Sequence, residues 1–349
     1  MEKYSKWRDF GTGIQPFLPI VPPNSRTRGI GSVSSILCTY VLGVVLSISR
    51  LLTLVAILSV DSLFTNVISN LFPTQYLRNT CKNFFRKNFA TLLLWNSGFL
   101  SIDQSVYSLK KFKSLKKSLD SGSKQPKSGD LIFSNHSSYI DVLYFISRYN
   151  PIFVEIDNAT LKMKPLKGWN AIISSCSKPK ALLNAKDAMS LSQISQDARK
   201  YNMGPIVVFP ENTTSNGLGL LKPLDIFSDP ENIDENISIF ITCLKYPSKR
   251  FSPTFPMGSP ISHYFWLNAN LTNKLSVVSV DPMECPTFKG LENKSSKGNA
   301  ERQEIDMDKE INSGMISCTK LKQTKLSTLD KLDFLAYYYA KSEQYKKNK

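Results

Sequence analysis

The stretch that decides the fold reads Leu-Ile-Phe-Ser-Asn-His-Ser-Ser-Tyr-Ile-Asp-Val-Leu-Tyr-Phe-Ile, from Leu131 to Ile146. A short apolar run passes through a polar turn rich in capping residues into an apolar helix start, a pattern that predicts a strand-to-helix turn. His136 lies in the turn and Asp141 follows five positions later. That separation is roughly 140° on a helix of about 3.6 residues per turn, so the side chains meet only if His136 precedes the helix.

His136 is one of only two histidines in the chain. An imidazole is the side chain best suited to moving a proton near neutral pH, and a nearby carboxylate can fix its tautomer and stabilise its charged form. The pattern is consistent with a general base and its orienting acid. A buried histidine that serves only the turn is an equally open interpretation. The other histidine, His263, has no motif around it and is predicted to be structural.

Beyond Gly129 the sequence alternates between strand-like and helix-like segments. The expected strands are 130–134, 152–156, 171–175, 206–209 and 237–244, with a helix over 185–201. Such alternation predicts an α/β fold in which a mixed, largely parallel sheet is flanked by helices. Ligands of such sheets bind where the carboxyl ends of strands meet the following turns.

The charge balance predicts an anionic partner. The chain has 44 Lys+Arg against 28 Asp+Glu, a formal net charge of +16, which favours nucleic acid, an anionic membrane or a phosphorylated ligand. No nucleic-acid motif is present, so we expect a membrane surface or phosphorylated ligand and no nucleic acid. The six cysteines lack metal-ligand spacing and fit a reducing compartment, and we predict no metal site.

An apolar stretch over residues 33–60 is long enough to cross a hydrocarbon core of about 30 Å. Arg50 interrupts it, and a charge at that depth costs roughly 2.5–3.5 kcal/mol. Basic residues flank both ends, which favours a hairpin or monotopic insertion over a single crossing. Residues 62–72 and 89–100 are expected to lie at the membrane interface. Core helices of a soluble protein are the alternative interpretation.

These patterns divide the chain into five expected regions. They are a polar N-terminal segment (1–31), an apolar membrane-associated region of helices (32–105), a basic linker or exposed helix (106–128), a catalytic domain (129–285), and a polar loop with a C-terminal helix (286–349). The final helix is expected from Thr328 to Tyr345.

A second motif reads Ile-Val-Val-Phe-Pro-Glu-Asn-Thr-Thr-Ser-Asn-Gly, from Ile206 to Gly217. A buried strand runs into a turn that is rich in hydroxyl and amide groups. Such a turn can hold a polar headgroup through side-chain and backbone donors. A loop that satisfies its own hydrogen bonds fits the same residues.

Together the two motifs resemble the glycerolipid acyltransferase family of the PlsC type, in motif form most like the fungal lysophosphatidic acid acyltransferases. That family pairs a His-x4-Asp motif, usually preceded by Asn, with a later Phe-Pro-Glu-Gly-Thr motif. The matching residues are Asn135, His136 and Asp141 in the first motif, and Phe209, Pro210, Glu211, Asn212 and Thr213 in the second. The resemblance covers residues 90–280.

The resemblance implies acyl-CoA-dependent acylation of a lysophospholipid hydroxyl, foremost 1-acyl-glycerol-3-phosphate (lysophosphatidic acid) to phosphatidic acid. His136 would be the general base and Asp141 would orient it. Acyl-CoA is a co-substrate, and no cofactor is implied. The implied substrate-binding residues are Glu211, Asn212, Thr213, Thr214, Ser215 and Lys222.

The resemblance also implies phospholipid and triacylglycerol metabolism at the endoplasmic reticulum membrane or a lipid droplet. Asn135 and Asn212 each begin an Asn-x-Ser/Thr sequon inside a motif. A glycan at either would block the motif, so the catalytic domain is expected to face the cytosol.

Departures from the family pattern leave the acceptor open. Asn212 stands where the family has Gly, although Asn tolerates left-handed geometry. Thr214 replaces a common Arg, which removes a bidentate phosphate clamp that Lys222 would have to replace. The second block lacks its Arg, and Lys178 and Lys180 are the nearest cations. Another lysophospholipid or glycerol-3-phosphate is the alternative acceptor, and a non-enzymatic lipid-binding or lipid-droplet protein is a third interpretation.

Overall fold

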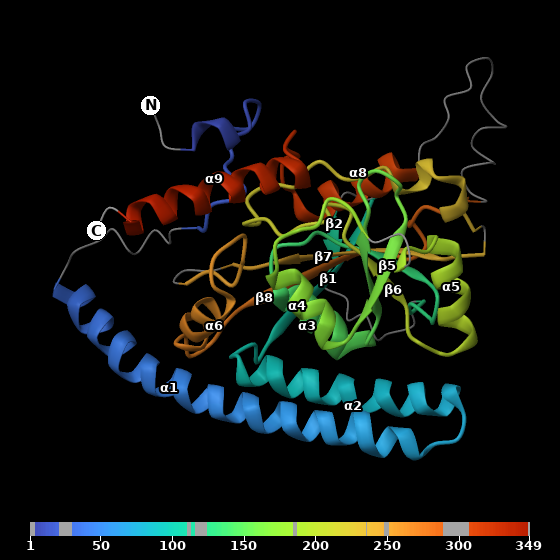
Figure 1. Cartoon of the computed structure of the whole chain (residues 1–349), viewed down its shortest axis with the longest axis horizontal. Helices are drawn as coiled ribbons and strands as arrows, with labels where there is room; N and C mark the ends of the chain where they lie inside the picture. Colours follow the sequence, from blue (N-terminus) through green and yellow to red (C-terminus); the bar gives the residue numbers. More distant parts are fainter. Residues whose placement is uncertain are drawn as a thin grey trace.

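The computed structural model describes residues 4–20, 30–109, 113–115, 124–183, 187–234, 236–247, 251–288 and 307–347. A mixed sheet of eight strands lies at its centre, with helices on both of its faces (Figure 1). The strands are β1 (Ile102–Ser108), β2 (Lys113–Leu115), β3 (Leu131–Phe133), β4 (Ile152–Ile156), β5 (Met163–Lys167), β6 (Ile206–Val208), β7 (Ile239–Lys245) and β8 (Leu275–Val280).

The strands lie in the order β2-β1-β8-β7-β3-β6-β4-β5. The pairs β1–β8, β3–β7, β3–β6 and β4–β6 are parallel, whereas β1–β2, β4–β5 and β7–β8 are antiparallel. The predicted mixed, largely parallel sheet flanked by helices is therefore confirmed.

The helices cover both faces because the central strands are buried on both sides. They are α1 (Ile30–Ser62), α2 (Gln75–Asn96), α3 (Tyr139–Tyr149), α4 (Trp169–Cys176), α5 (Leu191–Lys200), α6 (Pro260–Asn268), α8 (Met307–Thr319) and α9 (Thr328–Lys347), with short turns of helix at Ser5–Trp7, Leu63–Val67, Ile68–Leu71, Ile226–Ser228 and Pro230–Asn232. Leu131 and Phe133 of β3 share a buried cluster with α5 and α8. Ile132 points the other way, into a cluster with α2, α3, α4 and α6.

The register of β3 and β6 brings the two motifs together. The strands are parallel neighbours, and Phe133 at the end of β3 pairs with Val208 at the end of β6. Parallel strands end at the same edge of a sheet, so the turn with His136 and the turn with Glu211 leave that edge side by side.

Helices α1 and α2 run antiparallel along one side of the molecule (Figure 1). On α1, Gly43, Ser47 and Arg50 recur at helical spacing and face α6. A Cβ on Gly43 would lie 3.1 Å from the Ala269 carbonyl oxygen, and the Ser47 hydroxyl donates to the Phe265 carbonyl at 2.8 Å. The small residues therefore let α1 lie close against the domain.

Arg50 ties the middle of α1 to the end of α6. Its Nη1 donates to the carbonyls of Asn268 (2.9 Å) and Asn270 (2.7 Å), and its Nη2 donates to that of Leu271 (2.9 Å). These carbonyls lie at the helix C-terminus, where the helix dipole also favours a cation. The Arg50 charge, which would make a transmembrane crossing of α1 costly, is thus bound by carbonyl groups of the protein itself.

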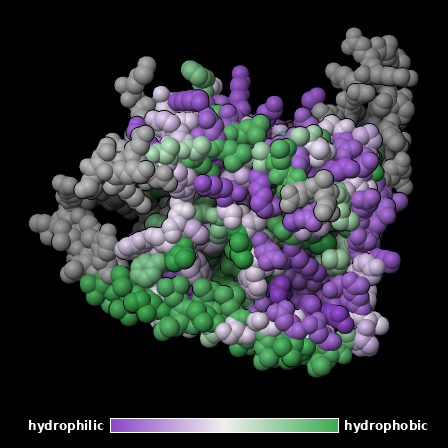
Figure 2. All heavy atoms as spheres, viewed as in Figure 1, coloured by the Kyte–Doolittle hydropathy of each residue, from purple (hydrophilic) through white to green (hydrophobic). Residues whose placement is uncertain are grey.

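One helical span, Val41–Leu71, is long and apolar enough to cross a membrane, and only 11% of its most apolar window is buried. Its outward side chains include Leu42, Val45, Leu52 and Val55, each more than half exposed. Figure 2 shows hydrophobic atoms gathered along the lower edge of the view, where α1 lies. This exposed apolar surface indicates membrane association.

Three local expectations differ from the structure. Residues 171–175, expected as a strand, belong to helix α4. The region 106–128, expected as a linker or exposed helix, contributes the end of β1 and all of β2 to the sheet, and 110–112 and 116–123 lie outside the described residues. The segment 89–100 does not lie wholly at an interface, because Ala90, Leu93 and Leu94 of α2 are buried in the core.

The two terminal segments pack together beside the second motif. Trp7 and Phe17 share a buried cluster with Leu221 and with Phe334 of α9. The expected C-terminal helix is present as α9, and α8 precedes it. Most of the expected polar loop after residue 285 lies outside the described residues.

Candidate active site

His136 and Asp141 meet as their spacing predicts. His136 lies in the turn after β3, Asp141 lies in the first turn of α3, and 3.1 Å separates the imidazole Nδ1 from the carboxylate Oδ2. Ser138 caps the helix and forms a capping box with Asp141. The same residues that start the helix therefore place the carboxylate beside the imidazole.

Asp141 is completely buried and accepts hydrogen bonds on both oxygens. Its Oδ2 also accepts from the backbone N–H groups of Ser137 (2.6 Å) and Ser138 (2.8 Å). The hydroxyl of Tyr246, from the loop after β7, donates to its Oδ1. These donors fix the carboxylate, so it holds His136 in one orientation and favours the tautomer that carries its proton on Nδ1.

The imidazole of His136 lies against the ring of Phe209, with the centroids 4.1 Å apart and the planes 12° from parallel. Phe209 is the last residue before the second turn, so the two motifs contact each other directly. With Nδ1 engaged by Asp141, Nε2 is the nitrogen left to exchange a proton with a ligand. His136 lines a pocket together with Asn212, Thr213 and Thr214.

Glu211 does not line this pocket; it is buried beneath the turn. Its Oε1 accepts from the backbone N–H of His136 (3.4 Å) and its Oε2 from that of Leu221 (3.1 Å). Burial raises its pKa to about 8, although both backbone N–H groups act in the opposite direction. Glu211 therefore links the two motifs on the side away from the pocket. The sequence predicts a substrate contact for this residue, and the structure places it beneath the turn instead.

Asn212 adopts the left-handed conformation expected of it, with φ +49°. Its side-chain Nδ2 donates to the Ile156 carbonyl at 2.7 Å, and its Oδ1 accepts from the Ile156 N–H at 3.2 Å. The amide thus continues the hydrogen bonding of β4 beyond the strand end. A glycine in this position could not make these two bonds.

Lys331 of α9 holds the turn at Thr214, and no local sequence signal marks it. Its Nζ donates to the Thr214 carbonyl (2.5 Å) and to the Thr214 hydroxyl (2.8 Å). The side chain is 3% exposed, and burial lowers its pKa to about 7 while Glu211 acts in the opposite direction. Thr328, in the first turn of α9, donates to the Glu211 carbonyl at 2.8 Å. The C-terminal helix is therefore part of the site.

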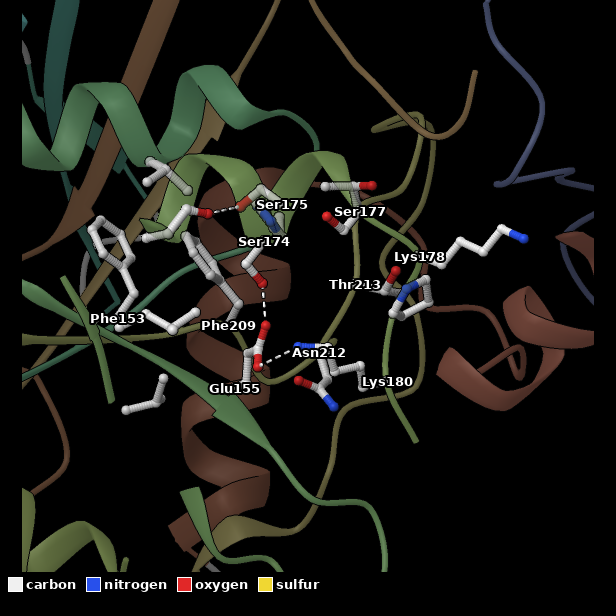
Figure 3. Close-up of a pocket in the computed structure, with 17 residues that line it drawn as sticks. Phe153, Glu155, Ser174, Ser175, Ser177, Lys178, Lys180, Phe209, Asn212 and Thr213 are labelled. Atoms are coloured by element: carbon white, nitrogen blue, oxygen red, sulfur yellow. Dashed lines mark hydrogen bonds and ion pairs between the residues drawn. The ribbon is translucent and has the colours of Figure 1, made fainter. Parts of the chain in front are cut away.

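Two lysines contribute cations to the pocket wall. Lys178 and Lys180 follow α4 and line the pocket with Ser174 and Ser177 (Figure 3). Lys180 lies 3.5 Å from Glu155, and the Lys178 ammonium lies 4.7 Å from the centroid of the Tyr339 ring. Lys222 and Ser215, both expected as substrate-binding residues, do not line this pocket. Ser215 instead donates its N–H to the His136 carbonyl at 3.0 Å.

His263 has a structural position, as its sequence context predicts. Its Nδ1 lies 2.9 Å from the Tyr139 hydroxyl, and its Nε2 lies 3.1 Å from the carbonyls of Ser252 and Thr254. Burial lowers its pKa to about 4, with the two carbonyls acting in the opposite direction. The neutral ring therefore joins α6 to the start of α3.

A separate apolar cavity of about 300 Å³ lies between α1, α2, α3, α4 and α6. Trp169, Ile172 and Cys176 of α4 line it, while Ala171, Ser174 and Ser175 of the same helix line the pocket of His136. Helix α4 therefore separates the pocket of His136, which both polar and apolar side chains line, from an almost wholly apolar cavity.

No protein-family model matches the chain. A protein of Schizosaccharomyces pombe that carries the provisional name lysophosphatidic acid:oleoyl-CoA acyltransferase is 29% identical over 244 residues, which are 70% of this chain and 74% of that protein. A lysophospholipid acyltransferase of Arabidopsis thaliana is 28% identical over 164 residues, which are 46% of this chain and 39% of that protein.

The crystal structure of the 1-acyl-sn-glycerophosphate acyltransferase PlsC from Thermotoga maritima aligns with a TM-score of 0.33 at 12% identity, over 77% of this chain and 97% of that chain. At this TM-score and identity the likeness is too weak to support a family relationship. The two motifs meet at one sheet edge, and the aligned segment shared with the yeast protein covers most of the chain. The chain is therefore similar over most of its length to an acyltransferase of lysophospholipids, and these relatives support the resemblance to the glycerolipid acyltransferase family that the two motifs predict.

Proposed function

We propose that the chain transfers an acyl group from acyl-CoA to the free hydroxyl of a lysophospholipid, with lysophosphatidic acid as the acceptor and phosphatidic acid as the product. The observation that carries this proposal is the His136–Asp141 pair, 3.1 Å apart, at a pocket that the Asn212–Thr214 turn also lines. The names of the yeast and plant relatives support the same acceptor class.

His136 acts as the general base. Its Nε2 takes the proton of the acceptor hydroxyl as the hydroxyl oxygen attacks the thioester carbonyl. Asp141 stabilises the imidazolium that forms, as the carboxylate does in a catalytic triad. When the tetrahedral intermediate collapses, the carbon–sulfur bond breaks and the imidazolium returns the proton to the departing CoA thiolate. The reaction requires no metal and no cofactor beyond the co-substrate.

The turn at Thr213 and Thr214 supplies the oxyanion donors. Next to His136, the backbone N–H groups are already engaged by Glu211 and Asp141. The N–H groups of Thr213 and Thr214 have no acceptor within the described part of the chain, and both residues line the pocket. Such free donors beside a developing negative charge stabilise the intermediate.

Lys178 and Lys180 bind the phosphate of the acceptor. They are the cations that line the pocket, and the turn itself carries Thr214 where an Arg would otherwise provide a bidentate clamp. Both lysines are exposed, so their charges attract an anionic headgroup from solvent before it reaches His136.

The acyl chain of one substrate lies in the apolar cavity beyond α4. That cavity is lined almost entirely by apolar side chains, and Leu51, Leu54 and Leu58 of the apolar helix α1 form part of its wall. A hydrocarbon chain could therefore pass from the membrane into the protein without crossing water.

The test is transfer of labelled oleoyl from oleoyl-CoA to lysophosphatidic acid by the purified full chain in detergent. We expect product with the wild type and none above background with His136→Ala, because the base is lost. Circular dichroism must show that the variant remains folded. Full activity in a folded His136→Ala variant would exclude this mechanism.

The acceptor is decided by a panel of lysophosphatidic acid, lysophosphatidylethanolamine, lysophosphatidylcholine and glycerol-3-phosphate. We expect the highest kcat/KM with lysophosphatidic acid. Its phosphate monoester carries more charge toward Lys178 and Lys180 than the phosphodiesters of the other two lysolipids, and its acyl chain, which glycerol-3-phosphate lacks, can enter the apolar cavity. Lys178→Gln/Lys180→Gln should raise its KM while leaving kcat nearly unchanged. Equal rates with all acceptors would reject the headgroup assignment and leave the acyl transfer in place.

The proposed location is the endoplasmic reticulum membrane or a lipid droplet, with the catalytic domain facing the cytosol. The side chain of Asn135 supports this orientation. Inside the core, its Nδ2 donates to the Leu244 carbonyl and its Oδ1 accepts from the Leu244 N–H. A glycan on Asn135 could not coexist with that fold. A tag on the C-terminus should be digested by protease in intact microsomes, and protection of the tag would reverse the orientation.

A further inference from the structure

Four basic residues gather where α2 meets the end of β5. Arg78, Lys82 and Arg86 recur every four residues along α2 and so share one face of that helix. Lys167 ends β5 beside them. All four are partly exposed, and none of them lines the pocket of His136. We call these four residues the basic cluster.

Arg86 anchors the basic cluster to its surroundings. Its guanidinium lies 3.6 Å from Asp61 of α1, donates to the Thr65 hydroxyl at 3.0 Å, and lies over the Trp169 ring. It also passes so close to Gly168 that a Cβ there would lie 2.1 Å from its Nη1. Gly168 has φ +60°, a conformation that favours glycine, and any larger residue there would displace the guanidinium from the start of α4.

The remaining charges of the basic cluster are not balanced by the protein. The pKa of Lys167 falls to about 8, through burial first and then through the charges of Arg86 and Lys82. Burial and the charges of Arg78 and Arg86 likewise lower the pKa of Lys82. Neither lysine has an ion pair or side-chain hydrogen bond with any described residue, and Asp61 is the one carboxylate paired with the cluster there.

The hydrogen-bond donors of the cluster are also only partly used. The Nε atoms of Arg78 and Arg86 are buried without an acceptor among the described residues. Repelling cations with unused donors destabilise a folded protein unless an anion binds them. A phosphate group, with several acceptor oxygens and negative charge, satisfies both needs.

The surroundings of the basic cluster indicate a lipid as the source of that phosphate. Large apolar side chains are exposed at the same end of the α1–α2 hairpin: Leu63, Val67, Leu71, Phe72, Leu77 and Phe84. Apolar groups that enter a membrane beside basic residues bring the basic residues to the level of the headgroups. A soluble phosphate compound would gain nothing from this apolar border.

We propose that Arg78, Lys82, Arg86 and Lys167 form a binding site for the phosphate headgroup of an anionic membrane lipid, distinct from the pocket of His136. The lipid bound there holds the hairpin at the membrane surface and neutralises the repulsion in the basic cluster. This assignment does not depend on the chemistry proposed for His136.

The experiment is flotation of the purified full chain with vesicles of phosphatidylcholine, alone or with added phosphatidylglycerol. Phosphatidylglycerol carries a phosphate diester and is neither substrate nor product of the proposed reaction. We expect it to increase binding of the wild type. The Lys82→Gln/Lys167→Gln variant should bind these anionic vesicles roughly 30-fold more weakly than the wild type, at about fivefold per lysine. Binding to pure phosphatidylcholine should not change.

The matched control is Lys274→Gln/Lys322→Gln, which removes the same charge from two exposed lysines elsewhere. An equal loss in the control would show that net charge alone attracts the membrane and would overturn the site. A second measurement protects against misfolding: without anionic lipid, Lys82→Gln/Lys167→Gln should melt at the wild-type temperature or above, because repulsion is relieved. A rise in melting temperature with inorganic phosphate equal to that with phosphatidylglycerol would reject a lipid as the ligand.

Discussion

At the scale of single residues, Asp141 has two tasks that can be separated. It caps α3 through the N–H groups of Ser137 and Ser138, and it orients His136. In Asp141→Asn one oxygen remains to accept from the backbone, so we expect a folded protein, but the orientation of His136 is lost. The predicted fall in kcat is roughly 10³–10⁴-fold. Single-turnover acyl transfer measures it.

Tyr246→Phe provides the comparison for this substitution. It removes only the hydroxyl that donates to Asp141 Oδ1 and leaves the contact with His136 intact. The loss of one hydrogen bond should lower kcat by about tenfold or less. If Tyr246→Phe and Asp141→Asn lost equal activity, the carboxylate would have no special role beside His136.

Lys331 is a positioning residue, because it acts on the pocket through Thr214. We predict that Lys331→Met lowers kcat/KM for acyl transfer by roughly tenfold, mostly through kcat, since Thr214 loses the two hydrogen bonds that hold its N–H toward the tetrahedral intermediate. Stability at neutral pH should change little or rise, because a buried cation is replaced by an apolar side chain of similar length. Melting curves and steady-state kinetics test both statements.

Lys322→Met is the matched control for that prediction. It removes the same charge from an exposed lysine just before α9. Its kinetics should match those of the wild type. A large fall in melting temperature for Lys331→Met, with kcat unchanged, would mean that Lys331 serves only the stability of α9.

At the scale of elements, His263 makes the junction of α6 and α3 sensitive to acid. Its folded-state pKa of about 4 lies below the value of about 6.5 for a free imidazole. Between these values the unfolded chain binds the extra proton, so stability is complete above pH 6.5 and is lost as pH falls toward 4. The loss is on the order of 3 kcal/mol, at about 1.4 kcal/mol for each pKa unit.

We therefore predict that His263→Gln, which cannot titrate, loses less stability than the wild type over the same pH range. Urea unfolding above pH 6.5 and near pH 4 gives the difference. Parallel losses in the two proteins would assign the acid sensitivity to other groups.

The elements also show which parts of the fold a sequence can predict. The contact between His136 and Asp141 follows from local capping chemistry, and β3 and β6 end at their motifs as expected. The sequence predicts a strand where α4 lies, because a short apolar run fits a buried strand and a buried helix equally well. Lys331 lies 117 residues from Thr214, and such a distant contact leaves no local signal.

At the scale of the whole molecule, α1 is fixed along the domain over much of its length. Gly43, Ser47 and Arg50 hold it against α6, and near its end Asp61 accepts from the Trp169 indole at 2.7 Å. The opposite face of the helix is apolar and exposed. A helix attached in this way can enter one leaflet with its outer face, but it cannot cross without releasing the domain.

We therefore predict that both ends of the apolar span Val41–Leu71 remain on the same side of the membrane. Single cysteines placed at Val41 and at Asn70, in a protein without its other cysteines, should both react with an impermeant maleimide added to intact vesicles. Protection of one position until detergent is added would demonstrate a crossing. Arg50→Leu tests the cause, because it removes three hydrogen bonds to the end of α6. Without them the middle of α1 is free to move into the bilayer, and we expect the label at one end to become partly protected.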